Sequence, residues 1–519
     1  MNINGNTENS STRIYTPKAA LICKTSNTVI LILLAVYFFI APGFIISNDL
    51  ADPALKGPGI PKIVWRTHQK VTPKFERWAR SRIASGIAAR LELHDVPGTE
   101  WPLFGSVYYL WTTELLQKAW EQDHTLASQA PREYARKAIE AATDLIMDPA
   151  HHTWVKQHWG KDYMHTQNVF FRFLIMAGIA SHQNLIQDGR HLDILRDQAD
   201  TLAAALDASP HGVLEDYPGE CYPIDVFAAI AGIKKADTVL GTDHSAFINR
   251  AMRGFDGKML DPYGLVPYIM EPLSGEIYIN SRGIGNSYVL IFAPGLYPEK
   301  AGLWYRAYER NFWQERMTAA GFREFPEDAS TQDTPNKAWG FDVDAGPIMA
   351  GFSPAANAYG VAAARVNGRF DHAYILGAQV LTATWPLPDG TLLGPRILSS
   401  AGHAPYLGEA NLMYLLAQQP APGVIIKTGG KLPGFVWIGI ALYFATGILI
   451  ILIALREHRI WNRSTNAVPF PRLQFNIWVI LLSTAVVAFA LGNGLIATTI
   501  CLAAQIFPKK GKNRLCTKD

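Results

Sequence analysis

Two uncharged hydrophobic stretches constrain this 519-residue chain more than any other feature of its sequence. The first covers residues 28–47 and the second residues 434–455. A helix needs about 20 apolar residues to cross the hydrocarbon core of a bilayer, and each stretch has that length. The first stretch is longer than the hydrophobic region of a secretory signal peptide, and it lacks a clean small-residue cleavage site. We therefore predict a retained transmembrane helix at 28–47 and a second one at 434–455.

A third uncharged stretch, residues 475–507, is too long for one straight crossing and short for two. Gly492, Asn493 and Gly494 interrupt it in the middle. A tilted single helix and a helix with a re-entrant turn are both compatible with this pattern, which leaves three or four crossings.

Basic residues indicate the orientation of the chain, because lysine and arginine are retained on the cytoplasmic side of a membrane. Those next to the first two stretches are Arg13, Lys18, Lys24, Arg456, Arg459, Arg463 and Arg472. They predict a cytoplasmic tail at 1–27 and a basic cytoplasmic loop at 456–474, with the domain between the helices on the extracytoplasmic side of an inner or plasma membrane. The basic tail 508–519 lies inside only if the third stretch turns back.

The composition of the chain gives no reason to expect nucleic acid as a partner. The net charge is +3, and no basic stripe occurs in the middle of the sequence. Cys221 is the only cysteine between the first two stretches, so that part holds no internal disulfide. The predicted partners are the lipid bilayer and a small-molecule or glycan substrate, and the oligomeric state is not defined.

The middle of the chain, residues 50–423, carries helical periodicity. Apolar residues recur at three- and four-residue spacing in segments separated by short connections rich in Gly, Pro, Asp and Asn. These segments are 105–122, 131–147, 164–182, 192–206, 223–240, 246–254, 286–292, 301–320, 346–366, 372–384 and 404–418. The absence of a βα rhythm predicts an all-α toroid of helical hairpins, and no fixed-period repeat supports the alternative solenoid. Residues 260–281 alternate instead and predict a small β-hairpin over one mouth of the toroid.

Three stretches of the middle occur in an informative order. They read MHTQNVFFRFLIMAGIA from Met164, HGVLEDYPGECYPIDVFAAIAG from His211, and LDPYGLVPYIMEPLSGEIYINS from Leu260, followed by a helix and GLYPE at Gly295. Together they resemble the linalool dehydratase-isomerase domain family. The resemblance covers much of the middle and none of the membrane segments. It implies an (α/α)6 barrel around a deep pocket and, in the named enzyme, reversible hydration and isomerisation of a monoterpene alcohol.

The residues that carry that family's chemistry carry over poorly to this chain, and its histidine and cysteine positions are not retained. The family uses a histidine, two cysteines, a glutamate, and carboxylate or tyrosine side chains around the substrate hydroxyl. This chain has Asn168 at the histidine, Glu215 at the first cysteine and Asp216 at the glutamate. The second cysteine falls near Ile224, and Cys221 is offset from it by about one helical turn. These differences separate the prediction of the fold from the prediction of the reaction.

The densest group of titratable residues is the stretch LEDYPGECYPID, which ends at Asp225. For each of these carboxylates taken alone, helix capping is the alternative role. Four acids beside two tyrosines in a stiff loop are instead typical of general acid–base catalysis, in which a buried carboxyl holds its proton near neutral pH. We predict three catalytic and two substrate-binding residues: Asp216, Glu220 and Asp225, and Tyr217 and Tyr222.

Two further clusters add candidates. Asn and Ser around residues 280–288 are ordinary N-caps, but Arg282 at the end of the hairpin is predicted to meet an acid or a polar substrate. Asp342 and Asp344 are two residues apart, so in an extended loop both face the same way. Helix capping is the alternative role for Asp344. We predict Asp344 as catalytic and Asp342 and Arg282 as substrate-binding.

Aromatic and histidine side chains mix between residues 151 and 168. Their spacing matches no zinc signature, so we predict no metal and no cofactor. Tyr163, His165 and Asn168 are predicted to contact the substrate instead.

The prediction for the whole chain is a membrane-anchored lyase or isomerase that uses carboxylate and tyrosine acid–base chemistry. A glycoside hydrolase or polysaccharide lyase on the same fold is the alternative, which the lost cysteines and the abundant carboxylates and tryptophans favour. A non-catalytic envelope binding domain is the second alternative, and it requires the acids to be caps that point outward.

Overall fold

The structure is a computed structural model that describes residues 14–15, 17–93, 95–257, 259–329, 338–401, 403–463, 470–490 and 494–506. The predicted basic tail 508–519, residues 1–13 of the predicted cytoplasmic tail and the interruption at 492–493 lie outside these residues. Contacts between Cα atoms divide the chain into two compact units. The terminal unit falls within Met1–Phe44 and Ile440–Asp519, and the central unit is Ile45–Gly439.

The terminal unit consists of apolar helices and one short strand pair. Its elements are β1 (Ile14–Tyr15), α1 (Pro17–Ala35), the π-helical turn η1 (Val36–Ile40), α2 (Ala41–Leu50), α20 (Gly434–Arg463), β8 (Phe470–Pro471), α21 (Arg472–Ala490) and α22 (Gly494–Ala504). The π-helical turn precedes Pro42, which has no N–H to donate to the carbonyl group four residues earlier. The stretch predicted as one tilted helix or a helix with a turn contains two helices, α21 and α22, which contact each other.

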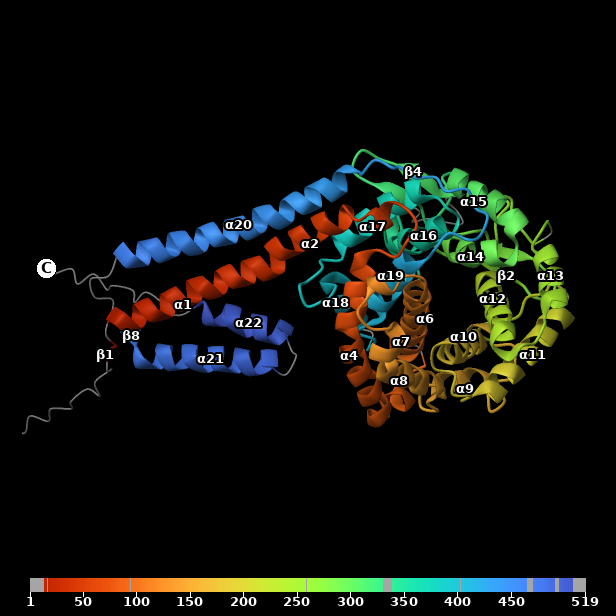
Figure 1. The fold of residues 1–519 in the computed structure, drawn as a ribbon, viewed down its shortest axis with the longest axis horizontal. Helices are drawn as coiled ribbons and strands as arrows, with labels where there is room; N and C mark the ends of the chain where they lie inside the picture. The colour runs from red at the N-terminus through yellow and green to blue at the C-terminus, as the bar shows by residue number, and fades with distance from the viewer. Residues whose placement is uncertain are drawn as a thin grey trace, which may run out of the picture. The chain divides into compact units, whose positions relative to one another are not determined.

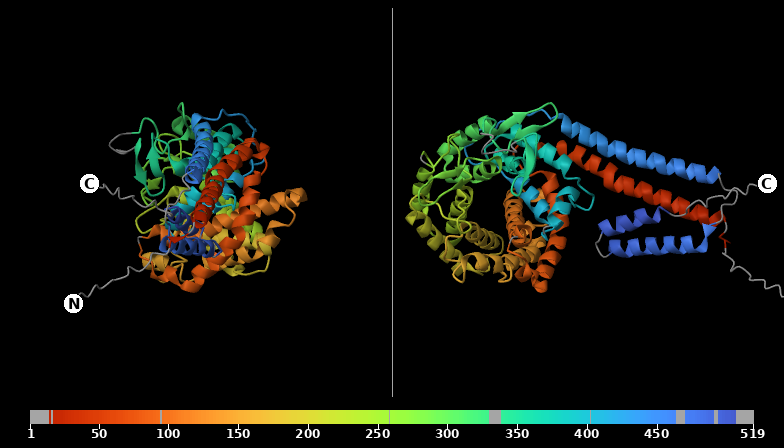
Figure 2. Two further views of the ribbon diagram at one scale, coloured as in Figure 1. Left: turned by 90° about the vertical axis from the view of Figure 1, so that its left-hand side faces the viewer. Right: turned by 180° about the vertical axis from the view of Figure 1, so that it is seen from behind.

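Small residues let α2 and α20 pack closely and in opposite directions (Figures 1 and 2). The rings of Phe44 and Phe444 meet edge to face, with their centroids 5.1 Å apart. A Cβ atom on Gly447 would lie 2.6 Å from the Ile40 side chain at the end of η1, so a larger residue there would displace that side chain. Residue numbers therefore rise along one helix as they fall along the other, and the pair is antiparallel.

Among the described residues, three helices are long and apolar enough to cross a membrane: Leu21–Leu50, Val169–Ile186 and Gly434–Ile460. Burial separates them, because 83% of the apolar window is buried in Val169–Ile186 but only 22% and 11% in the other two. Val169–Ile186 is therefore a core helix of the central unit, and the other two associate the chain with a membrane.

The central unit is mostly helical. Its longer helices are α4 (Lys62–Ser85), α6 (Trp101–Gln122), α8 (Arg136–Met147), α10 (Val169–Ile186), α11 (Leu192–Ala208), α12 (Pro223–Leu240), α13 (Ser245–Gly254), α14 (Gly283–Leu296), α15 (Pro298–Phe312), α16 (Pro354–Val366), α17 (Phe370–Ala383), α18 (Leu393–Ala401) and α19 (Leu407–Ala417). The short ones are α3 (Pro53–Lys56), η2 (Ile87–Arg90), α5 (Val96–Thr99), η3 (His124–Leu126), α7 (Pro131–Tyr134) and α9 (Thr153–Trp159). The all-α prediction is confirmed at this level.

Six helices of the central unit contact one another in a closed cycle: α6, α10, α12, α14, α16 and α19, which returns to α6. We call them the inner helices. The helices between them in the sequence pack on their outside; for example, α8 contacts α6 and α10, and α11 contacts α10 and α12. The chain thus alternates between buried inner helices and amphipathic outer ones (Figure 1).

The first turns of the inner helices lie together at one end. A Cβ atom on Gly105 of α6 would lie 3.4 Å from Leu407 of α19, and one on Gly283 of α14 would lie 3.0 Å from Ala356 of α16. The rings of Phe104 and Phe170 join the starts of α6 and α10 at 5.7 Å. The C-terminal ends of these helices consequently lie at the opposite end of the unit.

Among the residues that the structure describes, three antiparallel hairpins accompany the helices of the central unit. The predicted hairpin at 260–281 is present as β2 (Ile269–Met270) and β3 (Ile277–Ile279). Two others were not predicted: β4 (Trp313–Glu315) with β5 (Ala320–Phe322), and β6 (Trp339–Asp342) with β7 (Gly346–Met349).

These hairpins make two helix predictions wrong. The predicted helix 301–320 ends at Phe312, because Trp313 turns to an extended backbone, and its ring stacks on His372 at 4.0 Å. The predicted helix 346–366 begins only at Pro354, because Gly346, Ala350 and Gly351 have positive φ angles that no helix accommodates. The helix α4 was not predicted at all.

The buried Arg365 of α16 ties distant parts of the central unit together. Its Nε donates to the carbonyl oxygen of Gln418 at 2.8 Å, and its Nη1 donates to that of Ala54 at 3.1 Å. Its Nη2 donates to the carbonyl oxygen of Gly59. One side chain thus joins the segment before α4 to the segment after α19.

Replacing Arg365 tests how much the stability of the central unit depends on this connection between the segments before α4 and after α19. Arg365→Met keeps most of the apolar volume but leaves three carbonyl groups without their donor, so we expect the free energy of unfolding to fall by about 3–5 kcal/mol. Chemical denaturation of the full chain in lipid nanodiscs, followed by circular dichroism, measures this change. The exposed Arg253→Met is the matched control and should change it by less than about 0.5 kcal/mol. An equal fall in the free energy of unfolding of the two variants would contradict this role of Arg365.

Candidate acid–base site

The acidic loop between α11 and α12 folds as its sequence predicts. The peptide N–H of Glu220 donates to the carbonyl oxygen of Tyr217 at 2.9 Å across the Pro218–Gly219 turn. Gly219 has a φ angle of 85°, which glycine adopts without strain. Helix α12 begins at Pro223 and carries Asp225 in its first turn. The loop therefore delivers its acids to the end of the unit where the inner helices start.

Asp216 joins two of those helix starts. Its Oδ1 accepts the N–H of Phe170 in α10 at 3.0 Å, and its Oδ2 accepts the N–H of Tyr222 before α12 at 2.9 Å. Burial and the nearby Asp225 raise the pKa of Asp216, whereas the two N–H donors lower it. Both of its oxygens are occupied by the backbone, as expected for a residue that holds the loop in place.

Asp225 has a different environment. Within the described part of the chain, its carboxyl group receives no hydrogen bond and caps no helix. Burial, together with the charges of Asp344 and Glu100, raises the pKa of Asp225 to about 8. This carboxyl group is therefore mostly protonated at neutral pH, which is the form that a general acid needs.

Glu100, which was not predicted, lies immediately before α6 and belongs to the same group. Its Oε1 accepts the hydroxyl of Tyr217 at 2.6 Å. Burial raises the pKa of Glu100 to about 7, and the charge of Asp344 adds to this effect while the Tyr217 hydrogen bond opposes it. Its sequence context resembles that of Asp225. Each acid lies within two residues of a proline that marks the start of a helix, Pro102 for Glu100 and Pro223 for Asp225.

Asp344 approaches from the turn between β6 and β7. Its Oδ2 accepts the hydroxyl of Tyr268 at 2.5 Å. The guanidinium group of Arg282 lies over the Tyr268 ring at 4.4 Å and pairs with Asp342 at 2.9 Å and with Glu324 at 2.7 Å. Arg282 thus fixes the aromatic ring and the turn that together position Asp344. The predicted meeting of Arg282 with an acid is present, and Glu324 was not predicted.

Two predicted residues form a separate exposed pair at the edge of this group. The hydroxyl of Tyr222 donates to Glu220 Oε2 at 2.8 Å, and the Tyr222 ring meets the Tyr268 ring edge to face at 5.5 Å. Glu220 therefore lies on the solvent side of the loop.

Three other predicted residues lie elsewhere. Tyr163 bonds through its hydroxyl to Nδ1 of His152 at 2.9 Å. His165 is exposed and lies between two surface aspartates. Asn168 precedes α10 with a φ angle of 38° and donates to the carbonyl oxygen of Tyr163 at 3.1 Å. Within the described residues, none of the three contacts Asp225, Glu100 or Asp344.

Buried tyrosines lie on the inner side of the carboxyl groups. The hydroxyl of Tyr288 is buried and has no hydrogen-bond partner in the described part of the structure. Burial and the charge of Asp225 raise the pKa of Tyr288 far above its ordinary value. The hydroxyls of Tyr108 and Tyr359 lie 2.6 Å apart, and the Tyr359 and Tyr288 rings meet at 5.5 Å. These rings give the site an aromatic floor with unsatisfied hydroxyl capacity.

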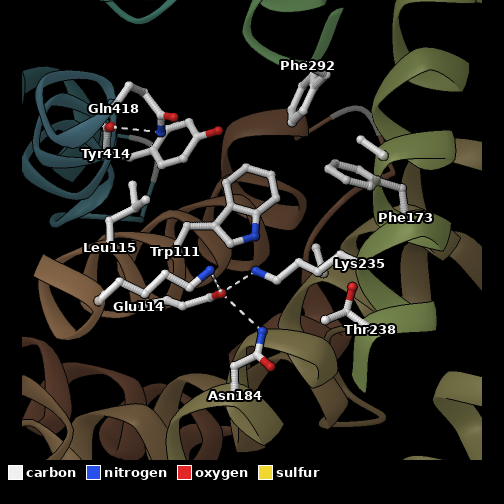
Figure 3. A pocket seen from close by; sticks show the side chains of 14 residues that line it. Trp111, Glu114, Leu115, Phe173, Asn184, Lys235, Thr238, Phe292, Tyr414 and Gln418 are labelled. Carbon is white, nitrogen blue, oxygen red and sulfur yellow. Dashed lines mark hydrogen bonds and ion pairs between the residues drawn. The ribbon is translucent and has the colours of Figure 1, made fainter. Parts of the chain in front are cut away.

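A cavity of about 280 Å³ opens near the opposite ends of the inner helices (Figure 3). Trp111, Phe173, Phe292 and Tyr414 are its aromatic walls. Lys235 lines it ten residues after Asp225, which is about 15 Å further along α12. The cavity and the carboxyl groups are therefore two distinct places in the central unit.

Comparisons with known proteins identify no family or relative for this chain. Neither the models of known protein families nor the curated protein sequences match the chain. Within the described residues, no group of three or more His, Cys, Asp or Glu side chains is arranged to hold a metal ion.

The raised pKa of Asp225 predicts a pH-dependent stability. Below pH ~4 this carboxyl group is protonated in both states. Between pH ~4 and ~8 the unfolded chain has released the proton that the folded chain keeps, so this group makes the folded state less stable as the pH rises. Asp225→Asn should therefore match the wild type at pH ~4 and exceed its free energy of unfolding by about 1–4 kcal/mol at pH ~8.

The measurement is denaturation of both proteins across this pH range. Asp193→Asn, at an exposed position of α11, is the control and should leave the pH dependence unchanged. A wild-type and Asp225→Asn pair with parallel pH curves would show that Asp225 ionises normally in the folded protein.

Proposed function

We propose that this protein is a membrane-anchored acid–base enzyme, a hydro-lyase or isomerase that acts on an alcohol, as the linalool dehydratase-isomerase family does. The observation that carries the proposal is the approach of three carboxyl groups, those of Asp225, Glu100 and Asp344, from three separate elements. Two of them have pKa values raised to the neutral range, at about 8 and about 7. Structural caps gain nothing from such pKa values, whereas proton transfer at neutral pH requires them.

We also assign the central unit to the (α/α)6 barrels. The support is the cyclic contact order of the six inner helices and the outer helices between them in the sequence. Such a barrel gathers the N-terminal ends of its inner helices around one mouth, where the three carboxyl groups occur.

In the proposed reaction, Asp225 donates its proton to the substrate hydroxyl, and the carbon–oxygen bond breaks to release water. Glu100 or Asp344, as a carboxylate, then takes a proton from the neighbouring carbon atom, and that C–H electron pair forms the new double bond. One proton is given and one is taken, so the site needs only an internal transfer to return to its starting state. The reverse sequence adds water to an alkene.

The aromatic floor suits the apolar body of such a substrate. Tyr288 offers an unpaired buried hydroxyl next to Asp225, which can bind the substrate oxygen. Tyr268 and Tyr217 keep Asp344 and Glu100 in place through their hydroxyls. A small alcohol with an apolar skeleton therefore matches the site better than a charged metabolite does.

Glycoside hydrolysis is the second candidate, and one observation favours it. Trp339 and Phe341 on the hairpin that carries Asp344 are 67% and 77% exposed, respectively. Exposed aromatic faces beside a pair of carboxyl groups suit the stacking of a sugar ring.

Activity assays on a panel of terpene alcohols and glycans test both candidates. Asp225→Asn should lower kcat/KM for an alcohol by about 100-fold or more, because it removes the general acid. The wild-type rate should fall as the pH rises through about 8, where Asp225 loses its proton. Asp193→Asn is the control and should keep wild-type activity. Equal activity in the three proteins would sink the site assignment, and turnover of glycans alone would favour the second candidate.

We propose that the central unit lies on the extracytoplasmic side of the membrane. The support is the antiparallel packing of α2 and α20, which directs Lys24 and Arg456 to the same end of the helix pair.

Cysteine labelling in intact cells tests this orientation. A membrane-impermeant maleimide should label a cysteine introduced at the exposed Lys234 and should not label one introduced at Arg456. Labelling of Arg456→Cys alone would reverse the assigned orientation.

A further inference from the structure

The cavity near the C-terminal ends of the inner helices is lined by none of the carboxyl groups of Asp225, Glu100 and Asp344 and has its own chemistry. Figure 3 shows Lys235 and Asn184 directed at the carboxylate of Glu114, beside the indole ring of Trp111. Glu114 Oε1 accepts Asn184 Nδ2 at 3.0 Å and Lys118 Nζ at 2.9 Å. Its Oε2 accepts Ser181 Oγ at 3.0 Å and Lys235 Nζ. Four donors therefore saturate this carboxylate.

The two lysines keep unused donors. Nζ of Lys235 carries three N–H groups and has two hydrogen-bond partners within the described residues, Glu114 and Ser181; it also lies over the Trp111 ring, 6.0 Å from its centroid. Lys118 pairs with Glu114, and its side chain is 63% exposed. The lining holds two positive charges and one negative charge, so the cavity has a surplus of one positive charge. An incoming group meets hydrogen-bond donors and positive charge, whereas the only carboxylate is occupied.

Aromatic and aliphatic side chains form most of the remaining wall, together with Asn184, Thr238 and Gln418. Trp111, Phe173, Phe292 and Tyr414 lie around the charged groups, and Ala231 belongs to the same lining. A volume of about 280 Å³ is near the lower end for ligand pockets and suits a molecule smaller than a typical drug. Shape and charge together define an apolar body with one anionic end.

We propose that this cavity binds an amphipathic monoanion, a small molecule whose single carboxylate contacts Lys235 and Lys118 and whose apolar body lies against Trp111 and Phe173. The helix C-terminal ends nearby favour cations, but that effect falls off within the last turn. Lys235 lies five residues before the end of α12, beyond that range. The proposal does not depend on the reaction at the carboxyl groups.

Binding to the full chain in lipid nanodiscs tests the proposal, with the signal of empty nanodiscs subtracted. Phenylacetate, phenethylamine and phenethyl alcohol share one skeleton and differ in charge, and calorimetry gives each dissociation constant. We expect phenylacetate to bind about tenfold or more tightly than the other two, because only it carries a negative charge that can pair with both lysines. Tighter binding of the amine would show that the helix carbonyl ends dominate and would overturn the proposal, as would equal binding of all three.

Two variants locate the site. Lys235→Gln should weaken phenylacetate binding by about tenfold or more. Lys234→Gln is its matched neighbour on α12; Lys234 is exposed and donates to the carbonyl oxygen of Gly295, so its loss should leave binding unchanged. Ala231→Phe keeps every charge but fills the cavity, and it should abolish binding. Asp225→Asn should bind as the wild type does. Wild-type binding by Lys235→Gln or Ala231→Phe would contradict the proposal.

Discussion

The central unit depends on one buried carboxyl group with two backbone bonds. Asp216 accepts the first free N–H groups of α10 and of the chain entering α12, so it replaces the separate caps that the two inner helices lack. Asn168, before α10, makes no side-chain cap of its own and has a left-handed backbone. Without Asp216, two helix starts would lose hydrogen bonds at the same place, and the loop that carries Tyr217 and Asp225 would lose its anchor.

That anchor has an electrostatic consequence. Holding a carboxyl group at the convergence of helix starts brings Asp225 close enough to raise the pKa of Asp216, while Asp344 and Glu100 raise the pKa of Asp225. A helix N-terminus alone would favour a charged Asp225 by about 0.3–1 kcal/mol. Burial and like charges oppose that preference and exceed it, so the proton stays bound near neutral pH. The buried Asp225 therefore lowers the stability of the folded chain at neutral pH, as is common for groups arranged for function.

The sequence predicted those parts of the molecule that depend on local chemistry. Uniformly apolar runs identified the helices at 21–50 and 434–460, and the Pro218–Gly219 turn with Pro223 identified the start of α12. Helix α4 escaped detection because charged residues separate the members of its buried face, such as Phe75, and because the helix contains the exposed Pro73. The sequence alone did not place Glu100 and Tyr288 beside Asp225, because Glu100 lies more than a hundred residues earlier in the chain and Tyr288 lies on a different helix, α14. Contacts between distant segments determine the site, and a single sequence does not record them.

The two ends of the inner helices carry different ionisable side chains: acidic ones at the N-terminal ends and basic ones toward the C-terminal ends. Carboxyl groups gather where the N-terminal ends carry partial positive charge, and Lys235 and Lys118 occur toward the ends that carry partial negative charge. At the first end, burial of Asp225 and Glu100 suppresses ionisation, so the site keeps protons. At the second end, Glu114 remains ionised because two lysines lower its pKa to about 2, and the lysine charges exceed the carboxylate charge by one. The same packing of helices therefore produces one end where carboxyl groups keep their protons and another that presents fixed positive charge.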